Sequence, residues 1–133
     1  MSRENVSLFR QVIDAFNRRD FDAYLALMDP SVEFMPYERA VEGLGPYRGH
    51  DGVRTWLENS LQSIPDLRAE LHDVRSRGDK TFARGRLYGT GAESGATFDR
   101  TLWLANKWRD GKTLWWYAFD DETAALQAIG RKL

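Results

Sequence analysis

Apolar residues in the first half of the chain recur at spacings that match one face of an α-helix. The pattern predicts helices over residues 3–18, 20–29 and 51–63. Asp20 is a residue type that favours a helix N-cap. The second helix is expected to stop at Asp29, because Pro30 follows and the residue before a proline avoids the helical conformation. The first two helices should therefore form a tight pair.

Later in the chain the apolar residues alternate with polar ones, which is typical of strands with one buried face. Strands are predicted over residues 31–35, 67–77, 80–90, 98–108 and 113–120. Residues 38–51 are rich in glycine and are expected to form a loop. Asp110-Gly111 is a strong signal for a hairpin turn. A last short helix is expected from Asp121 to Ile129, with Gly130 as its C-cap.

The order of these elements is α-α-β-α-β-β-β-β-α, so the helices come first and neighbouring strands follow. This segregation is typical of the α+β class rather than of a parallel α/β sheet. The 133 residues suit a single domain over residues 1–133. We expect a cone-shaped fold in which N-terminal helices pack on a curved antiparallel sheet and enclose a cavity.

Composition excludes several classes of protein. The chain has no cysteine, which rules out disulfides, thiolate zinc sites and cysteine nucleophiles. The net charge of −1 is not that of a typical nucleic-acid binder. The histidines, His50 and His72, lie on different predicted elements, so no metal site is expected, and no cofactor motif is present. Since no secretory signal and no membrane-spanning run is visible, we expect a cytoplasmic protein without a membrane partner.

The strands near the end of the chain are unusually aromatic. Aromatic residues make up 13% of the sequence, and the alternation of the last strand places Trp116 on one face and Trp115 with Tyr117 on the other. Both faces are apolar, and a sheet that is apolar on both sides is covered on both sides. One cover should be the helices and the cavity. We predict that the other is a second copy of the chain, in a homodimer through Trp115, Tyr117 and Trp103.

Two carboxylates are candidate catalytic bases. Glu33 lies on the first predicted strand and Asp120 at the end of the last. A carboxylate inside an aromatic cavity would have a raised pKa and would suit general base catalysis. The alternative is a solvated charge at the rim or, for Asp120, a cap of the helix that follows.

Polar residues on the middle strands are candidate ligand contacts. Arg84, Arg86 and Tyr88 share one face of a strand. If this face lines the cavity, it can hold a carboxylate, an enolate or a carbonyl group; if it faces outward, the arginines are ordinary surface cations. His50 either reaches a ligand or bonds to the backbone at a helix start. The complete set of predicted ligand-binding residues is Arg86, Tyr88, Arg100, Trp116, Trp56, Met35 and His50.

Four passages resemble the SnoaL-like group of the nuclear transport factor 2-like superfamily. They are FNRRDFDAY at residues 16–24, DPSVEF at 29–34, YRGHDGV at 47–53, and RDGK at 109–112 followed by AFDD at 118–121. The resemblance covers nearly the whole chain. It implies a cone-shaped fold with a deep pocket, often in a homodimer through the outer face of the sheet.

The family includes enzymes that resemble ketosteroid isomerases, limonene epoxide hydrolases and polyketide cyclases, as well as non-catalytic members. The isomerases' tyrosine, base and aspartate correspond to Val12, Met35 and Leu104 here, so that mechanism is not expected. The epoxide hydrolases' Asp–Arg–Asp set is not expected to form either, because adjacent residues of a strand point to opposite faces. The resemblance to the cyclases favours Asp120 as a base.

Two functional hypotheses follow. In the first, the chain is a cofactor-independent enzyme of the cyclase, isomerase or hydrolase type, acting on a small, largely apolar, oxygenated molecule. In the second, it is a non-catalytic module that binds such a molecule or dimerises. An acid–base pair inside the cavity would favour the enzyme. An apolar cavity with every carboxylate at its rim would favour the binding protein.

Overall fold

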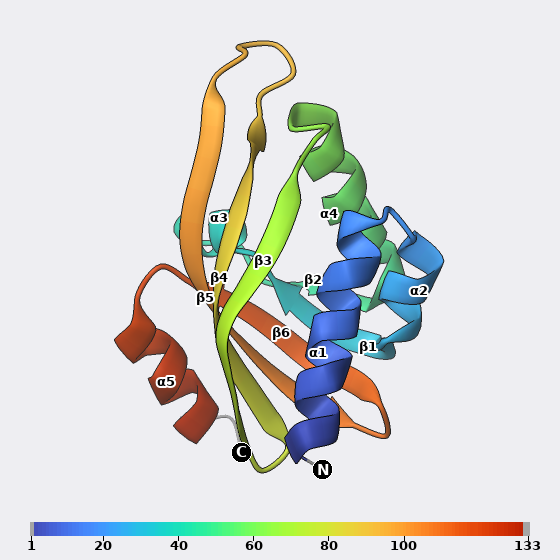
Figure 1. Cartoon of the computed structure of the whole chain (residues 1–133), viewed down its shortest axis with the longest axis vertical. Coiled ribbons are helices and arrows are strands. Elements are labelled where there is room, and N and C mark those ends of the chain that lie inside the picture. The colour runs from blue at the N-terminus through green and yellow to red at the C-terminus, as the bar shows by residue number, and fades with distance from the viewer. Residues whose placement is uncertain (1, 132–133) are drawn as a thin grey trace.

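The computed structural model describes residues 2–131. Its elements, shown in Figure 1, are α1 (Ser2–Asn17), α2 (Phe21–Ala26), β1 (Met28–Met35), α3 (Tyr37–Val41), β2 (Tyr47–Arg48), α4 (Gly49–Ser63), β3 (Arg68–Arg77), β4 (Lys80–Thr90), β5 (Thr97–Arg109), β6 (Lys112–Phe119) and α5 (Glu122–Arg131). Helices α1, α2 and α4 cover one face of the sheet, and α5 lies on the other (Figure 1). The expected α+β fold, with helices on a curved sheet, is confirmed.

The sheet has the strand order β2-β1-β6-β5-β4-β3. Each pair of neighbours is antiparallel except β1 and β6, which run parallel. The sheet is therefore mixed, and the expectation of a purely antiparallel sheet was wrong. Parallel neighbours need a long connection, and here most of the chain lies between the two strands.

The ends of two helices differ from the prediction. Asp20 caps α2 as expected, because its side chain accepts a hydrogen bond from the backbone N–H of Ala23 at 3.1 Å. However, α2 ends at Ala26, and Pro30 lies inside β1. The pairing of β1 with β6 is irregular between Met28 and Glu33, and such an irregularity tolerates a proline, which has no N–H to donate. Gly130 does not close the last helix, since α5 continues to Arg131.

The segment expected to be a loop contains two short elements. Helix α3 has five residues and strand β2 has two. Strand β2 pairs with β1 through the Glu33–Arg48 and Phe34–Tyr47 positions. Elements this short span little more than one hydrophobic period, so the sequence pattern has no repeat that could predict them.

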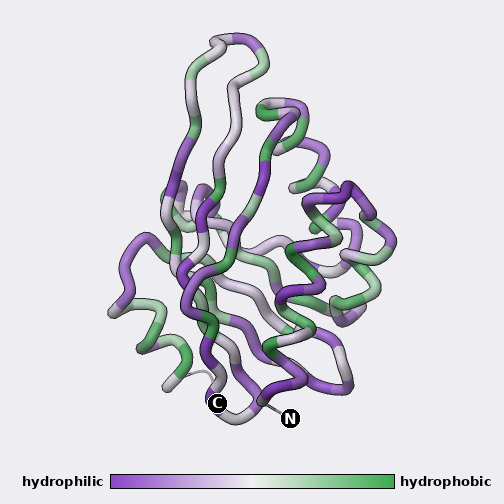
Figure 2. The backbone as a smooth tube through the Cα atoms, viewed as in Figure 1, coloured by the Kyte–Doolittle hydropathy of each residue, from purple (hydrophilic) through white to green (hydrophobic). Residues whose placement is uncertain are grey.

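Two hydrophobic clusters form on opposite faces of the sheet. Hydrophilic and hydrophobic positions follow one another along the strands (Figure 2). On the helix-covered face, Trp116 joins the main cluster with α1 and α4. On the other face, Trp115 packs in a smaller cluster with Ala125 and Ile129 of α5. The division of the two tryptophans between the faces is confirmed. Helix α5 covers part of the outer face of the sheet, for which the sequence pattern predicts a second copy of the chain as the cover.

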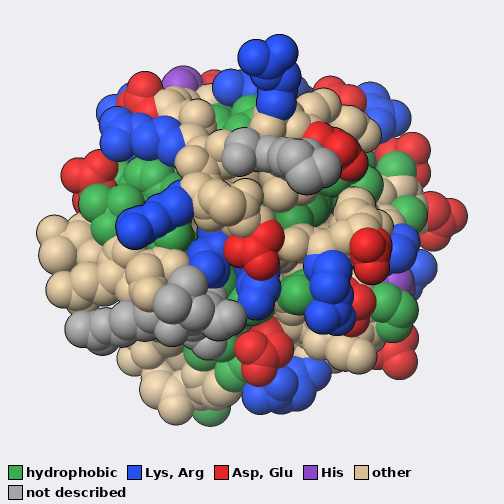
Figure 3. Space-filling view, turned by 90° about the horizontal axis from the view of Figure 1, so that it is seen from below, with side chains coloured by type: hydrophobic (Ala, Val, Ile, Leu, Met, Phe, Trp, Pro, Cys, Tyr) green, Lys and Arg blue, Asp and Glu red, His purple; other side chains and the backbone are tan. Residues whose placement is uncertain are grey.

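The surface carries charges of both signs. In the view from below, Lys and Arg side chains alternate with Asp and Glu, with hydrophobic atoms between them (Figure 3). Within residues 2–131, no helix has both the length and the apolar character needed to cross a bilayer.

Candidate ligand-binding cavity

A cavity lies between the helices and the concave face of the sheet. It has a narrow inner chamber of ≈ 60 Å³ and a wider outer chamber of ≈ 570 Å³. Five residues line both chambers, which places the chambers next to each other: Tyr37, Glu38, Trp56, Leu87 and Leu102. The outer chamber is bounded by α3, α4 and the β4–β5 hairpin.

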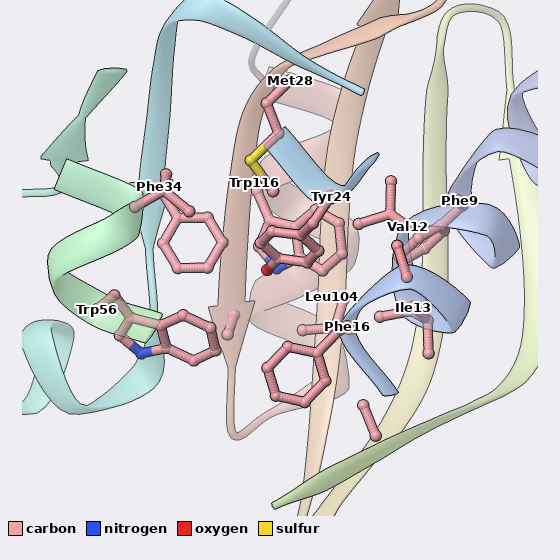
Figure 4. Packing of buried hydrophobic residues seen from close by; sticks show 14 of the residues in the cluster. Phe9, Val12, Ile13, Phe16, Tyr24, Met28, Phe34, Trp56, Leu104 and Trp116 are labelled. Carbon is pink, nitrogen blue, oxygen red and sulfur yellow. The ribbon is translucent and has the colours of Figure 1, made fainter. Parts of the chain in front are cut away.

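The wall of the inner chamber is mainly aromatic. Phe34 packs against Trp56 and Trp116, with ring centroids 5.0 and 6.0 Å apart. Phe16 of α1 lies 6.1 Å from Trp56 and 5.9 Å from Tyr24. Figure 4 shows these rings facing one another across the space between the helices and the sheet. Burial raises the pKa of Tyr24 well above its usual value, so its hydroxyl stays protonated.

Alternation along the strands explains which side chains reach the cavity. Gly85 and Leu87 of β4 line it, as do Leu102 of β5 and Trp116 and Ala118 of β6. Their neighbours in sequence point to the opposite face, because successive side chains of a strand alternate, although the long side chain of Arg86 still borders the inner chamber.

A tyrosine–aspartate pair lies beside the cavity, in which Tyr37 lines both chambers and Asp120 lines neither. The hydroxyl of Tyr37 donates a hydrogen bond to Asp120 Oδ2 at 2.9 Å. This hydrogen bond is the main cause that raises the pKa of Tyr37. The guanidinium of Arg100 lies 5.2 Å from the centre of the Tyr37 ring. The helix cap that was the alternative role for Asp120 belongs to Asp121, whose Oδ2 accepts from the N–H of Ala124 at 3.0 Å.

Glu38 is a carboxylate on the wall of the cavity. It lines both chambers and accepts a hydrogen bond from Trp56 Nε1 at 2.8 Å. It is not among the predicted site residues, since it lies in the segment expected to be a loop. Glu38 and Asp120 are exposed, and Glu70, which borders the inner chamber, is half-buried. Within residues 2–131, none of the carboxylates at the cavity is therefore sealed from solvent.

Five of the predicted site residues line neither chamber: Asp120, described above, and Glu33, Met35, His50 and Tyr88. Glu33 belongs to the outer face of β1 and accepts a hydrogen bond from Arg48 at 2.8 Å. Met35 shares that face, opposite Tyr117 in the sheet register. His50 lies at the start of α4, where its Nε2 is 2.9 Å from the carbonyl oxygen of Met28. Its observed contact is therefore the backbone contact that was one of its two alternatives.

The arginine face of β4 points outward. Arg86 donates two hydrogen bonds to Asp99, at 2.9 and 2.8 Å, and lies 3.6 Å from Glu70. The hydrogen bonds from Arg86 hold the pKa of Asp99 below its usual range. The guanidinium also stacks on Tyr88, 4.2 Å from its ring centre. Arg86 borders the inner chamber, but its charge is matched by these partners.

The structure brings four of the predicted ligand contacts to the cavity. Trp56, Trp116 and Arg86 line the inner chamber, and Arg100 lines the outer one. Tyr24 and Tyr37 also line the inner chamber but were not predicted. Tyr24 is buried on α2, where a hydroxyl among apolar residues is the only sequence signal for it. No cluster of metal-ligating side chains occurs within the described part of the chain.

The SnoaL-like domain model matches residues 9–116 of the chain. No curated protein matches the sequence.

The structure is similar to solved structures of the same fold, each at low sequence identity. An NTF2-like protein of unknown function from Burkholderia pseudomallei has a TM-score of 0.77 and 21% identity, over 93% of this chain and 95% of that one. TerC, co-crystallized with polyporic acid, has a TM-score of 0.76 and 22% identity, over 96% and 98%. IdmH from Streptomyces antibioticus, provisionally assigned as a polyketide cyclase, has a TM-score of 0.73 and 21% identity, over 93% and 96%.

Proposed function

Because the chain belongs to the SnoaL-like domain family, we propose that it binds a small, largely apolar, oxygenated molecule in the cavity between its helices and its sheet. The observation that carries this proposal is the two-chambered cavity, whose wall is largely apolar and aromatic and whose bordering carboxylates, Glu38, Glu42 and Glu70, all reach solvent. The outer chamber falls within the range of about 300–1,000 Å³ that is usual for small-molecule sites.

The chemistry of the walls supports a flat, mainly apolar ligand. Aromatic rings bury large areas and favour stacked or edge-on contacts with other rings. TerC, a structural neighbour, was co-crystallized with polyporic acid, which is consistent with a ligand-binding role for this fold. A mainly apolar cavity in which each bordering carboxylate of the described residues still reaches solvent favours the binding hypothesis over the enzymatic one.

A fluorescence titration tests this proposal. Trp56 and Trp116 line the inner chamber, so a bound aromatic ketone should change their emission. We expect 2-acetylnaphthalene to give a saturable change in emission with a micromolar dissociation constant. A dissociation constant of about 1 μM corresponds to a binding free energy of about −8 kcal/mol. If neither this ketone nor its hydrocarbon analogue 2-ethylnaphthalene gives a saturable change, the proposed cavity function is wrong.

A second candidate function is proton transfer on the bound molecule. It is favoured by the hydrogen bond between Tyr37 and Asp120 beside Arg100, which provides a base, a hydroxyl and a cation at the exposed side of the cavity. This reaction requires an orientation in which the carbonyl group of the bound molecule lies at that side. Asp120 would then take a proton from the carbon next to the carbonyl group, and Arg100 would stabilise the enolate.

Deuterium exchange of the acetyl protons of 2-acetylnaphthalene in D₂O, followed by NMR, measures this activity. We expect the wild-type protein to accelerate the exchange and Asp120→Asn to reduce the acceleration by about 10²–10⁴-fold. Glu33→Gln is the matched control, because Glu33 lies on the outer face of the sheet and pairs with Arg48. Equal rates for wild type and Asp120→Asn would leave the chain a binding protein only.

We further propose that the outer face of the sheet forms a homodimer. Helix α5 leaves Trp103, Tyr117 and Phe119 half-buried beside the buried Trp115, and a second copy would cover them. Sedimentation at micromolar concentration should show twice the chain mass. A monomer under these conditions contradicts the proposal.

A further inference from the structure

Tyr24 carries a buried hydroxyl on the wall of the inner chamber. The residue is 2% exposed and lines this chamber. Burial alone accounts for its raised pKa. Within residues 2–131 its hydroxyl has no hydrogen-bond partner.

Trp116 brings a second polar group to the same chamber. It is 5% exposed and lines the chamber, and its ring packs edge-on against Phe9. Unlike Trp56 and Trp108, whose indole nitrogens donate to Glu38 and Thr81, Trp116 has no hydrogen-bond partner among the described residues. Figure 4 shows Tyr24 and Trp116 at the centre of the aromatic cluster.

Both polar atoms face open space rather than packed protein. Among the described residues, Asn106 Nδ2 is the one side-chain polar atom that is both sealed from solvent and without a partner. The Tyr24 oxygen and the Trp116 nitrogen lack partners but are not sealed, so they border space that water or a ligand can fill. Buried polar groups are almost always hydrogen-bonded, and these two are satisfied when the chamber is filled.

We infer that Tyr24 and Trp116 form a hydrogen-bonding anchor for a neutral carbonyl oxygen at the inner end of the cavity, an assignment that rests on the proposed binding function. An indole N–H only donates, so the matching ligand atom must accept. The ligand group is neutral because the cation that borders this chamber, Arg86, is occupied by Asp99 and Glu70. An unpaired carboxylate would be costly to bury there.

The sizes of the chambers agree with this orientation. A water molecule needs about 10–15 Å³ of such space, so the inner chamber of ≈ 60 Å³ admits a small group but not a ring system. The apolar body of the ligand therefore occupies the outer chamber, and its carbonyl end points inward. The preferred ligands are aryl ketones, quinones and esters rather than hydrocarbons or free acids.

Paired probes and single-atom variants test the anchor. Calorimetric titrations compare 2-acetylnaphthalene with 2-ethylnaphthalene, which has the same shape but no acceptor. Tyr24→Phe should weaken binding of the ketone about five- to tenfold, the worth of one net hydrogen bond, and leave binding of the hydrocarbon unchanged. Tyr88→Phe is the matched control, because it removes the same atom from a tyrosine that lines neither chamber and stacks on Arg86 on the outer face of the sheet.

The indole resonances provide a direct readout. In a ¹⁵N–¹H spectrum, the Trp116 N–H peak, assigned through Trp116→Phe, should shift downfield with the ketone but not with the hydrocarbon. If the ketone binds but this peak does not shift and Tyr24→Phe binds normally, the anchor is wrong while the cavity function stands. If neither probe binds, the cavity function fails as well.

Discussion

Replacing Phe9 by alanine is expected to lower the free energy of unfolding by about 3–5 kcal/mol. Phe9 is fully buried on α1. Its ring packs against Trp116 at 5.2 Å and Trp108 at 6.4 Å. The substitution removes apolar contact and leaves a void behind the wall of the inner chamber, because the strands that carry the two tryptophans cannot collapse onto α1.

Urea denaturation followed by circular dichroism measures this loss. Phe98→Ala is the control, since Phe98 is half-buried at the outer chamber. This substitution should lower the free energy of unfolding markedly less than Phe9→Ala does. If Phe9→Ala leaves too little folded protein, Phe9→Leu provides a smaller loss, below about 1.5 kcal/mol for a hydrophobic replacement of similar volume. Equal losses for Phe9→Ala and Phe98→Ala would show that Phe9 does not support the cavity wall.

The elements that the sequence predicted well are those with several hydrophobic periods. Helix α1 buries Phe9, Val12, Ile13 and Phe16 on one stripe. Strand β3 packs the alternate residues Ala69, which is buried, and Leu71, which is half-buried, against the same core. When one face of an element is buried, apolar residues recur in the sequence with the period of that helix or strand. The parallel pairing of β1 with β6 has no comparable signal, because it depends on how distant parts of the chain meet.

The candidate site was only partly predictable for a related reason. Alternation states which residues of a strand share a face, but not which face meets the cavity. It correctly separated Trp115 from Trp116. It left the direction of Arg86 and Tyr88 open, and these stack on each other on the outer face. The ion pairs of Arg86 with Asp99 and Glu70 on the neighbouring strands show that this face of β4 points outward. These pairs depend on the register between strands, which a local sequence pattern does not contain.

The cavity itself gives the second large effect that we expect. Leu87 is half-buried and lines both chambers, so a larger side chain there would fill the passage between them. Leu87→Trp should weaken binding of 2-acetylnaphthalene by about ten- to a hundredfold, since displacing an overpacked side chain costs about 1–3 kcal/mol. Because Leu87 is not fully buried, the folded structure should survive the substitution.

Leu126→Trp is the matched control for this variant. It makes the same substitution on α5, at a residue that is 45% exposed and lies on the opposite side of the sheet from the cavity. Calorimetry should show wild-type affinity for Leu126→Trp and the predicted loss for Leu87→Trp, with both variants folded by circular dichroism. If Leu87→Trp is folded and still binds with wild-type affinity, the ligand does not span the two chambers. If it is unfolded, Leu87→Phe makes the same comparison with a smaller obstruction, and undiminished binding by that variant contradicts the placement of the ligand across both chambers.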